Sequence, residues 1–201
     1  MSKEAYKQAA LFFVDTVARV QPSQWDDGGL GEWNVRDLVG HTSRSLTRVE
    51  EFCAQPAEKA TVLSAAEHYR ISLAPANVND EIAARGREAG AELGDDPAAA
   101  VRTAADRVLP LLDGLSEDMV ITYPNGGIRL GDYLETRVVE LTVHSLDLAN
   151  AIGADAEAPA EALSVTLHLL ADLAVASGQG AALALAATGR GLLPDRFSLM
   201  G

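Results

Sequence analysis

The chain of 201 residues contains a single cysteine, Cys53. One cysteine cannot form an internal disulfide, so the fold must be stabilised by packing, and a framework of paired cysteines is excluded. A free cysteine behaves as a small apolar side chain. We therefore expect Cys53 to fill space in a helical core rather than to act as a nucleophile.

Basic residues are also scarce. The chain has 16 Lys and Arg against 29 Asp and Glu, which gives a formal net charge of -13, and no basic patch stands out. Proteins that bind nucleic acids rely on clusters of Lys and Arg to neutralise phosphates. We therefore expect no nucleic-acid partner.

Long apolar runs are missing as well. No stretch reaches the roughly 20 apolar residues that a membrane-spanning helix needs. Residues 1–7 lack the apolar core of a secretion signal. These features predict a cytoplasmic protein with no membrane partner.

Aromatic residues make up only 5% of the chain, and runs of β-branched residues are few, whereas 35 residues are alanine. Alanine has the highest intrinsic helix propensity. The length suits one substantial core rather than two. The composition thus predicts an all-α protein with a single domain.

Apolar periodicity and turn residues predict the positions of the helices. The expected helices span residues 3–20, 35–54, 64–71, 77–93, 97–112, 131–152 and 159–177. Residues 119–122 and 128–130 lie on either side of a turn and fit the pattern of a β-hairpin. Residues 1–153 are expected to form a bundle of four long helices with short additional ones. Residues 154–201 are expected to form a C-terminal helix and an apolar tail that packs on the bundle within the same domain.

Local signals support three helix ends. Asn34, followed by Asp37, is typical of an N-cap with an acidic first turn. Pro97, after two aspartates, suits the first helical position. Gly153 suits the left-handed residue that ends a helix.

The most informative pair is Glu140 and His144. At an (i, i+4) spacing, both side chains lie on one face of a helix whose neighbouring residues are apolar. Neither residue type is stable in an apolar setting unless a partner satisfies it. A bound divalent cation would do so, and an ordinary salt bridge from Glu140 to Arg137 or Arg44 is the alternative.

His41 lies near the core side of the helix expected over residues 35–54. If that helix packs beside the one carrying Glu140 and His144, two imidazoles and one carboxylate meet. This is the ligand count of a catalytic zinc site, which keeps a further position open. The same set suits iron, nickel or manganese. Asp147 lies on roughly the same face as His144 and is expected either to orient its ring or to pair with an arginine.

The two other histidines have no carboxylate at a helical spacing that points to a shared site. We therefore expect His68 and His168 to be structural or exposed. Alone, His41 would also more often be a hydrogen-bonded histidine than a metal ligand.

Two segments together resemble the mycothiol-dependent maleylpyruvate isomerase N-terminal domain family, within the DinB-like superfamily. They are Gly31-Glu32-Trp33-Asn34-Val35-Arg36-Asp37-Leu38-Val39-Gly40-His41 and Arg137-Val138-Val139-Glu140-Leu141-Thr142-Val143-His144-Ser145-Leu146-Asp147-Leu148-Ala149. An ending like Ala187-Thr188-Gly189-Arg190-Gly191 adds to the likeness, which covers most of the chain. The resemblance implies a DinB-like four-helix bundle with a divalent metal, usually zinc, and places its ligands on His41, Glu140 and His144.

The resemblance also implies chemistry. It points to a metal-dependent enzyme that uses a low-molecular-weight thiol such as mycothiol, for cis-trans isomerisation or for S-transfer to a small electrophilic substrate. The isomerase that names the family has an additional C-terminal domain with a catalytic arginine, and this chain ends about 50 residues after His144. We expect Arg190 to be part of a structural turn rather than a replacement for that arginine, which places isomerisation of maleylpyruvate itself in question.

Two other functions stay open. One is a non-catalytic metal-binding bundle that serves as a binding or assembly module. The other is a helical dimerisation domain with a buried salt bridge from Glu140 to an arginine, and a homodimer is compatible with every interpretation. Arg36 and Arg44 flank the expected site and are weak candidates for binding a polar cofactor, as are Trp33 and Asp37, although each also suits a cap or a solvated surface.

Overall fold

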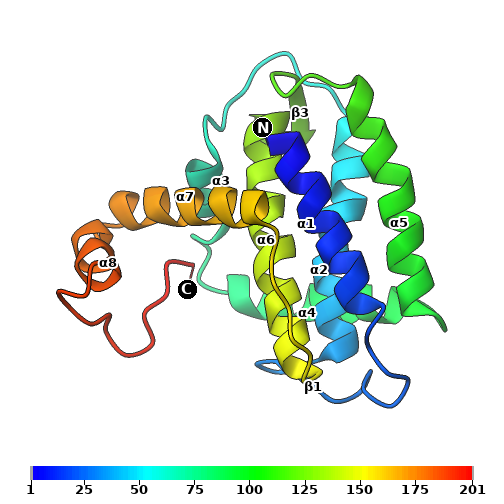
Figure 1. The fold of residues 1–201 in the computed structure, drawn as a ribbon. Helices are drawn as coiled ribbons and strands as arrows, with labels where there is room; N and C mark the ends of the chain where they lie inside the picture. The colour runs from blue at the N-terminus through cyan, green and yellow to red at the C-terminus, as the bar shows by residue number, and fades with distance from the viewer. Residues whose placement is uncertain (1, 201) are drawn as a thin grey trace.

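The structure is a computed structural model and describes residues 2–200 (Figure 1). Within that range the protein is helical apart from two short antiparallel hairpins. The helices are α1 (Ser2–Val17), α2 (Val35–Cys53), α3 (Ala65–Ser72), α4 (Val78–Glu92), α5 (Pro97–Leu111), the 3-10 turn η1 (Leu112–Gly114), α6 (Leu130–Ala151), α7 (Ala160–Ala176) and α8 (Gly180–Ala187). The hairpins pair β1 (Gly28–Leu30) with β2 (Trp33–Asn34) and β3 (Val120–Tyr123) with β4 (Gly126–Arg129). The all-α prediction is confirmed.

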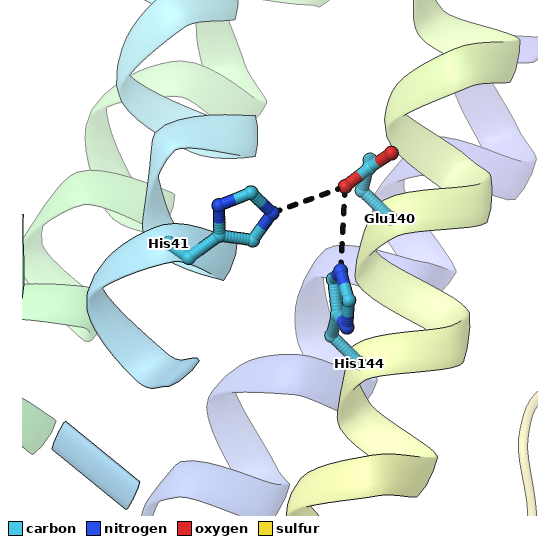
Figure 2. Close-up of side chains that lie close together, drawn as sticks. All are labelled: His41, Glu140 and His144. Atoms are coloured by element: carbon cyan, nitrogen blue, oxygen red, sulfur yellow. Dashed lines mark hydrogen bonds and ion pairs between the residues drawn. The ribbon is translucent and has the colours of Figure 1, made fainter. Parts of the chain in front are cut away.

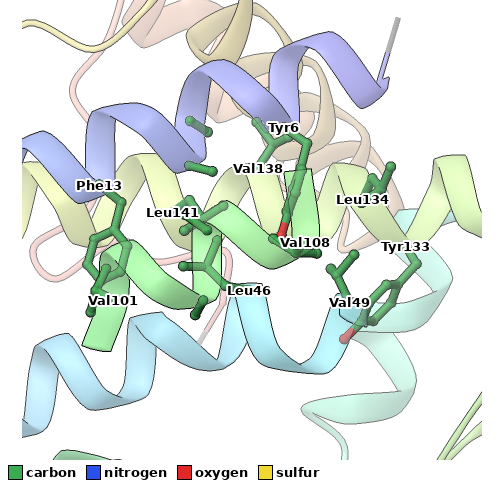
Figure 3. Packing of buried hydrophobic residues seen from close by; sticks show 14 of the residues in the cluster. Tyr6, Phe13, Leu46, Val49, Val101, Val108, Tyr133, Leu134, Val138 and Leu141 are labelled. Atoms are coloured by element: carbon green, nitrogen blue, oxygen red, sulfur yellow. The ribbon is translucent and has the colours of Figure 1, made fainter. Parts of the chain in front are cut away.

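The long helices α1, α2, α5 and α6 form the bundle, with α6 in contact with both α1 and α2. Figure 3 shows apolar side chains of these four helices meeting in the core. The labelled residues are Tyr6, Phe13, Leu46, Val49, Val101, Val108, Tyr133, Leu134, Val138 and Leu141. The predicted helical bundle of the DinB-like type is therefore confirmed. Burial of this apolar surface is the main force that holds α2 beside α6.

Side-chain caps fix where several helices begin. The Asn34 side chain accepts a hydrogen bond from the Asp37 backbone N–H at 2.8 Å, as predicted. Ser64 and Asp96 cap α3 and α5 in the same way, and Pro97 occupies the start of α5. These caps satisfy backbone donors that a helix N-terminus leaves free.

One helix boundary and two short elements differ from the sequence prediction. Helix α1 ends at Val17 rather than near residue 20, because the N–H groups of Arg19 and Val20 bond three residues back in a tightened last turn. The glycine-rich β1 and β2 hairpin was not predicted, since glycine and such short strands give little β signal. Within the stretch expected as an apolar tail, residues 180–187 form the alanine-rich helix α8, which was not predicted.

Two glycines allow α4 to lie directly against α2. A Cβ atom at Gly40 would lie 2.2 Å from the backbone nitrogen of Gly90, so the two backbones touch. Nearby, the Trp33 ring packs where a side chain at Gly86 would be, and its Nε1 donates to the Ala83 carbonyl at 3.1 Å. Helix α4 thus fixes the N-terminal half of α2, which includes His41 in its second turn.

Helix α7 crosses α1 and α6, and α8 extends away from the bundle with the chain that follows it (Figure 1). Helix α8 has no buried residue, whereas Leu199 and Met200 are partly buried against the side of the bundle near α3 and α7. The grouping of residues 154–201 with the bundle as one domain stays a prediction. No helix in residues 2–200 has both the length and the apolar character needed to cross a membrane.

Candidate metal site

His41, Glu140 and His144 meet between α2 and α6 (Figure 2). Glu140 Oε2 lies 3.3 Å from His41 Nε2 and 3.4 Å from His144 Nε2. One ligand atom from each residue lies within 4.8 Å of the other two. Zinc ligands at about 2.0–2.2 Å in a tetrahedral arrangement lie roughly 3.3–3.6 Å apart, and both distances from Glu140 to the histidines match this spacing.

The side chains of the triad are mostly withdrawn from solvent, with exposed fractions of 16% for His41, 14% for Glu140 and 17% for His144. Burial of a carboxylate is costly unless opposite charge and hydrogen bonds compensate. Here two imidazole Nε2 atoms face one carboxylate oxygen, which is a donor set that zinc, iron, nickel and manganese accept. The chemistry of the residues therefore fits a divalent metal.

The pKa values of the triad reflect the opposing effects of burial and mutual contact. Burial lowers the pKa of His41, and the hydrogen bond to Glu140 opposes that shift only in part. For His144, burial acts downward, but hydrogen bonds to Asp147 and Glu140 outweigh it and raise the pKa to about 9. Burial would raise the pKa of Glu140, yet the two histidines and the charge of Arg137 hold it well below its usual range.

Asp147 contacts the second ring nitrogen of His144, with 3.0 Å between Nδ1 and Oδ2. Of the two contacts expected for Asp147, the structure has the one with the His144 ring. A carboxylate at Nδ1 keeps a proton on that nitrogen, so Nε2 is the nitrogen that would bind a metal once its own proton is displaced. His41 has no such partner, since its buried Nδ1 makes no hydrogen bond within residues 2–200, and its ring instead stacks on Trp33 with centroids 4.6 Å apart.

Tyr69 is a contact of the site that the sequence reasoning missed. Its hydroxyl lies 2.8 Å from Glu140 Oε1, the carboxylate oxygen that does not face the histidines. Tyr69 is 71 residues from Glu140 in sequence, on the short helix α3. No spacing rule links the two, so only the packing of α3 on α6 could reveal the contact.

The model of the Mycothiol maleylpyruvate isomerase N-terminal domain family matches residues 6–149. The chain belongs to this family. The matched range includes all of α2 and α5, most of α1 and α6, and every residue of the triad. No curated protein and no solved structure matches the chain.

Arg36 and Arg44, the two arginines expected to flank the site, have different surroundings. Arg36 donates to the Gly94 carbonyl at 2.9 Å and lies over the Trp25 ring, so it has a structural role at the end of α4. Arg44 forms no ion pair among the described residues, and burial and neighbouring arginines lower its pKa. Neither arginine hydrogen-bonds to the triad.

The salt bridge from Glu140 to an arginine is also absent from the described residues. Arg137 instead donates to Thr136 and lies over the Tyr133 ring at 5.1 Å from its centroid. Glu140 lies within ion-pairing distance of the two histidines instead, and Arg137 acts on it through its charge without such a contact among the described residues. The interpretation that relied on a Glu140–arginine salt bridge loses its main feature.

The remaining candidates lie apart from the triad. His68 is buried among tyrosines, and His168 is exposed and bonded within α7, so both fit the structural reading. Arg190 is exposed in the tail and bonds to the Thr188 carbonyl. Cys53 is buried, and burial raises the pKa of its thiol to about 11, which suits a filler of space.

Proposed function

We propose that the protein is a zinc-dependent enzyme that uses a low-molecular-weight thiol, such as mycothiol, for isomerisation or S-transfer on a small electrophilic substrate. The observation that carries this proposal is the set of three ligands, two histidines and one glutamate, with no fourth protein ligand among the described residues. Catalytic zinc sites keep that further position for water or substrate. Membership of the isomerase-named family supports the choice of a thiol as co-substrate.

In this proposal each residue of the site has a separate role. His41, Glu140 and His144 would hold the metal, and a bound zinc ion lowers the pKa of a coordinated thiol enough to keep it as a thiolate. Asp147 fixes the His144 ring with Nε2 directed at the site. Trp33 restricts the His41 ring by stacking, and the buried surroundings limit competition from water.

The test is thiol-dependent turnover by metal-loaded protein. Mycothiol with monochlorobimane reports S-transfer, and mycothiol with maleylpyruvate reports isomerisation. We expect His144→Ala to abolish turnover, whereas the control His168→Ala, which changes an exposed histidine on α7, keeps it. Turnover that survives both metal removal and His144→Ala would contradict the proposal.

One observation favours a second candidate, a non-catalytic metal-binding bundle that serves as an assembly module. A cavity of about 720 Å³ between α3 and α7 has Tyr69 in its wall but none of the three ligands. A substrate bound in this cavity would therefore not contact the metal ligands. The module would bind metal with no thiol-dependent turnover and no thermal stabilisation by mycothiol. If mycothiol raises the melting temperature of the metal-loaded protein but not that of the metal-free protein, the enzyme is favoured. A ligand that binds the native state raises its apparent stability.

A further inference from the structure

Tyr69 connects the short helix α3 to the candidate metal site. The residue is 3% exposed, and it packs in a second apolar cluster with Ala65, Val139, Leu169 and Leu173. The hydroxyl emerges from that cluster toward α6, 2.8 Å from Glu140 Oε1 and 3.1 Å from the Thr136 carbonyl oxygen. The ring is therefore fixed by packing, and only the hydroxyl reaches the site.

The two carboxylate oxygens of Glu140 consequently have different partners. Oε1 accepts from Tyr69, while Oε2 faces the Nε2 atoms of His41 and His144. A carboxylate can bind a cation through one oxygen or through both. A hydrogen bond to Oε1 competes with metal binding by that oxygen and orients Oε2 toward the histidines.

We propose that Tyr69 is a positioning residue that holds Glu140 as a single-oxygen metal ligand and so keeps a coordination position free for substrate or thiol. This inference rests on the proposed metal-dependent function. A tyrosine hydroxyl carries one proton at neutral pH, and at 2.8 Å it can donate that proton to Glu140 Oε1. Hydrogen bonds to a carboxylate are stronger than those between neutral groups, which favours Glu140 over the Thr136 carbonyl as the acceptor.

The test uses the full chain loaded with Co²⁺, whose visible absorption is intense for four-coordinate sites and weaker for five-coordinate ones. Tyr69→Phe removes the hydroxyl and retains the ring in its cluster. We expect Co²⁺ still to bind to Tyr69→Phe, but with the weaker five-coordinate spectrum and an affinity roughly 10–100-fold lower, as for other outer partners of metal ligands. Tyr133→Phe, which changes another buried tyrosine with no hydrogen bond to Glu140, is the control and should keep the wild-type spectrum.

Unchanged absorption and affinity in Tyr69→Phe would overturn the role of Tyr69 while leaving the metal site in place. Failure of the wild-type protein to bind Co²⁺ or Zn²⁺ would instead overturn the proposed function itself. A second measurement needs only the wild-type protein. Infrared difference spectra of wild-type protein with and without Zn²⁺ should show the wide separation of carboxylate stretches typical of single-oxygen binding, and a narrow separation would contradict the inference.

Discussion

The Nδ1 atom of His144 lies 3.0 Å from the Oδ2 atom of Asp147, one turn further along α6. This contact lets one helix supply two proposed metal ligands, Glu140 and His144, and the group that orients one of them. The spacing of all three residues follows from the helical repeat. The third ligand, His41, depends on the packing of α2 against α6.

Asp147→Ala should therefore weaken metal binding without unfolding the protein. The His144 ring would lose the partner that sets its tautomer, and we expect a roughly 10–100-fold lower zinc affinity. Competition with a chelating dye measures this, with Asp106→Ala at an exposed position of α5 as the control. Equal affinities of Asp147→Ala and the control would contradict the orienting role.

Gly40→Ala should destabilise the protein, because its Cβ would meet the Gly90 backbone at 2.2 Å. Overpacking of this kind typically costs about 1–3 kcal/mol of unfolding free energy. Urea unfolding measures the loss, and Gly28→Ala, where a Cβ has no neighbour within 4 Å, is the matched control. A stability loss no larger than that of the control would show that the two helices can separate without cost.

Acid should destabilise the fold through His68. Burial, followed by the charge of Arg137, lowers the pKa of His68 to about 3 from a usual 6.5, so the unfolded chain binds its proton more tightly. Stability is then lost as the pH falls below 6.5 and the loss is complete near 3. We expect about 2–3 kcal/mol of loss between pH 6.5 and 4 from this residue.

The comparison is with His68→Phe, measured by urea unfolding across this pH range. The variant should lose less stability in acid than the wild type, whereas His168→Gln should follow the wild type. Parallel pH profiles of His68→Phe and the wild type would rule out His68 as a source of acid sensitivity.

Cys53 should resist alkylation in the native protein. Its side chain is buried, and its pKa of about 11 leaves almost no thiolate at pH 8. Iodoacetamide at pH 8, followed by mass spectrometry, should modify Cys53 only after denaturation. Rapid native labelling would mean that the end of α2 opens locally.

The long helices and the three residues of the triad could be predicted from the sequence, whereas some contacts of the site could not. Helix periodicity and the Asn34 cap identified α2, and the (i, i+4) pair on α6 needed only a neighbouring helix to bring in His41. Tyr69 could not be found this way, because its contact with Glu140 depends on the tertiary placement of α3. The hydrogen bond from Arg36 to the Gly94 carbonyl after α4 could not be predicted either. It depends on the close approach of the α2 and α4 backbones at Gly40.

The metal content of untagged protein, purified without added metal, tests the central claim most directly. Elemental analysis should find close to one divalent ion per chain in the wild type and in the His168→Ala control, and it should find the ion lost from His41→Ala and His144→Ala. Wild-type protein that contains no stoichiometric metal, and binds none when zinc is supplied, would contradict the account.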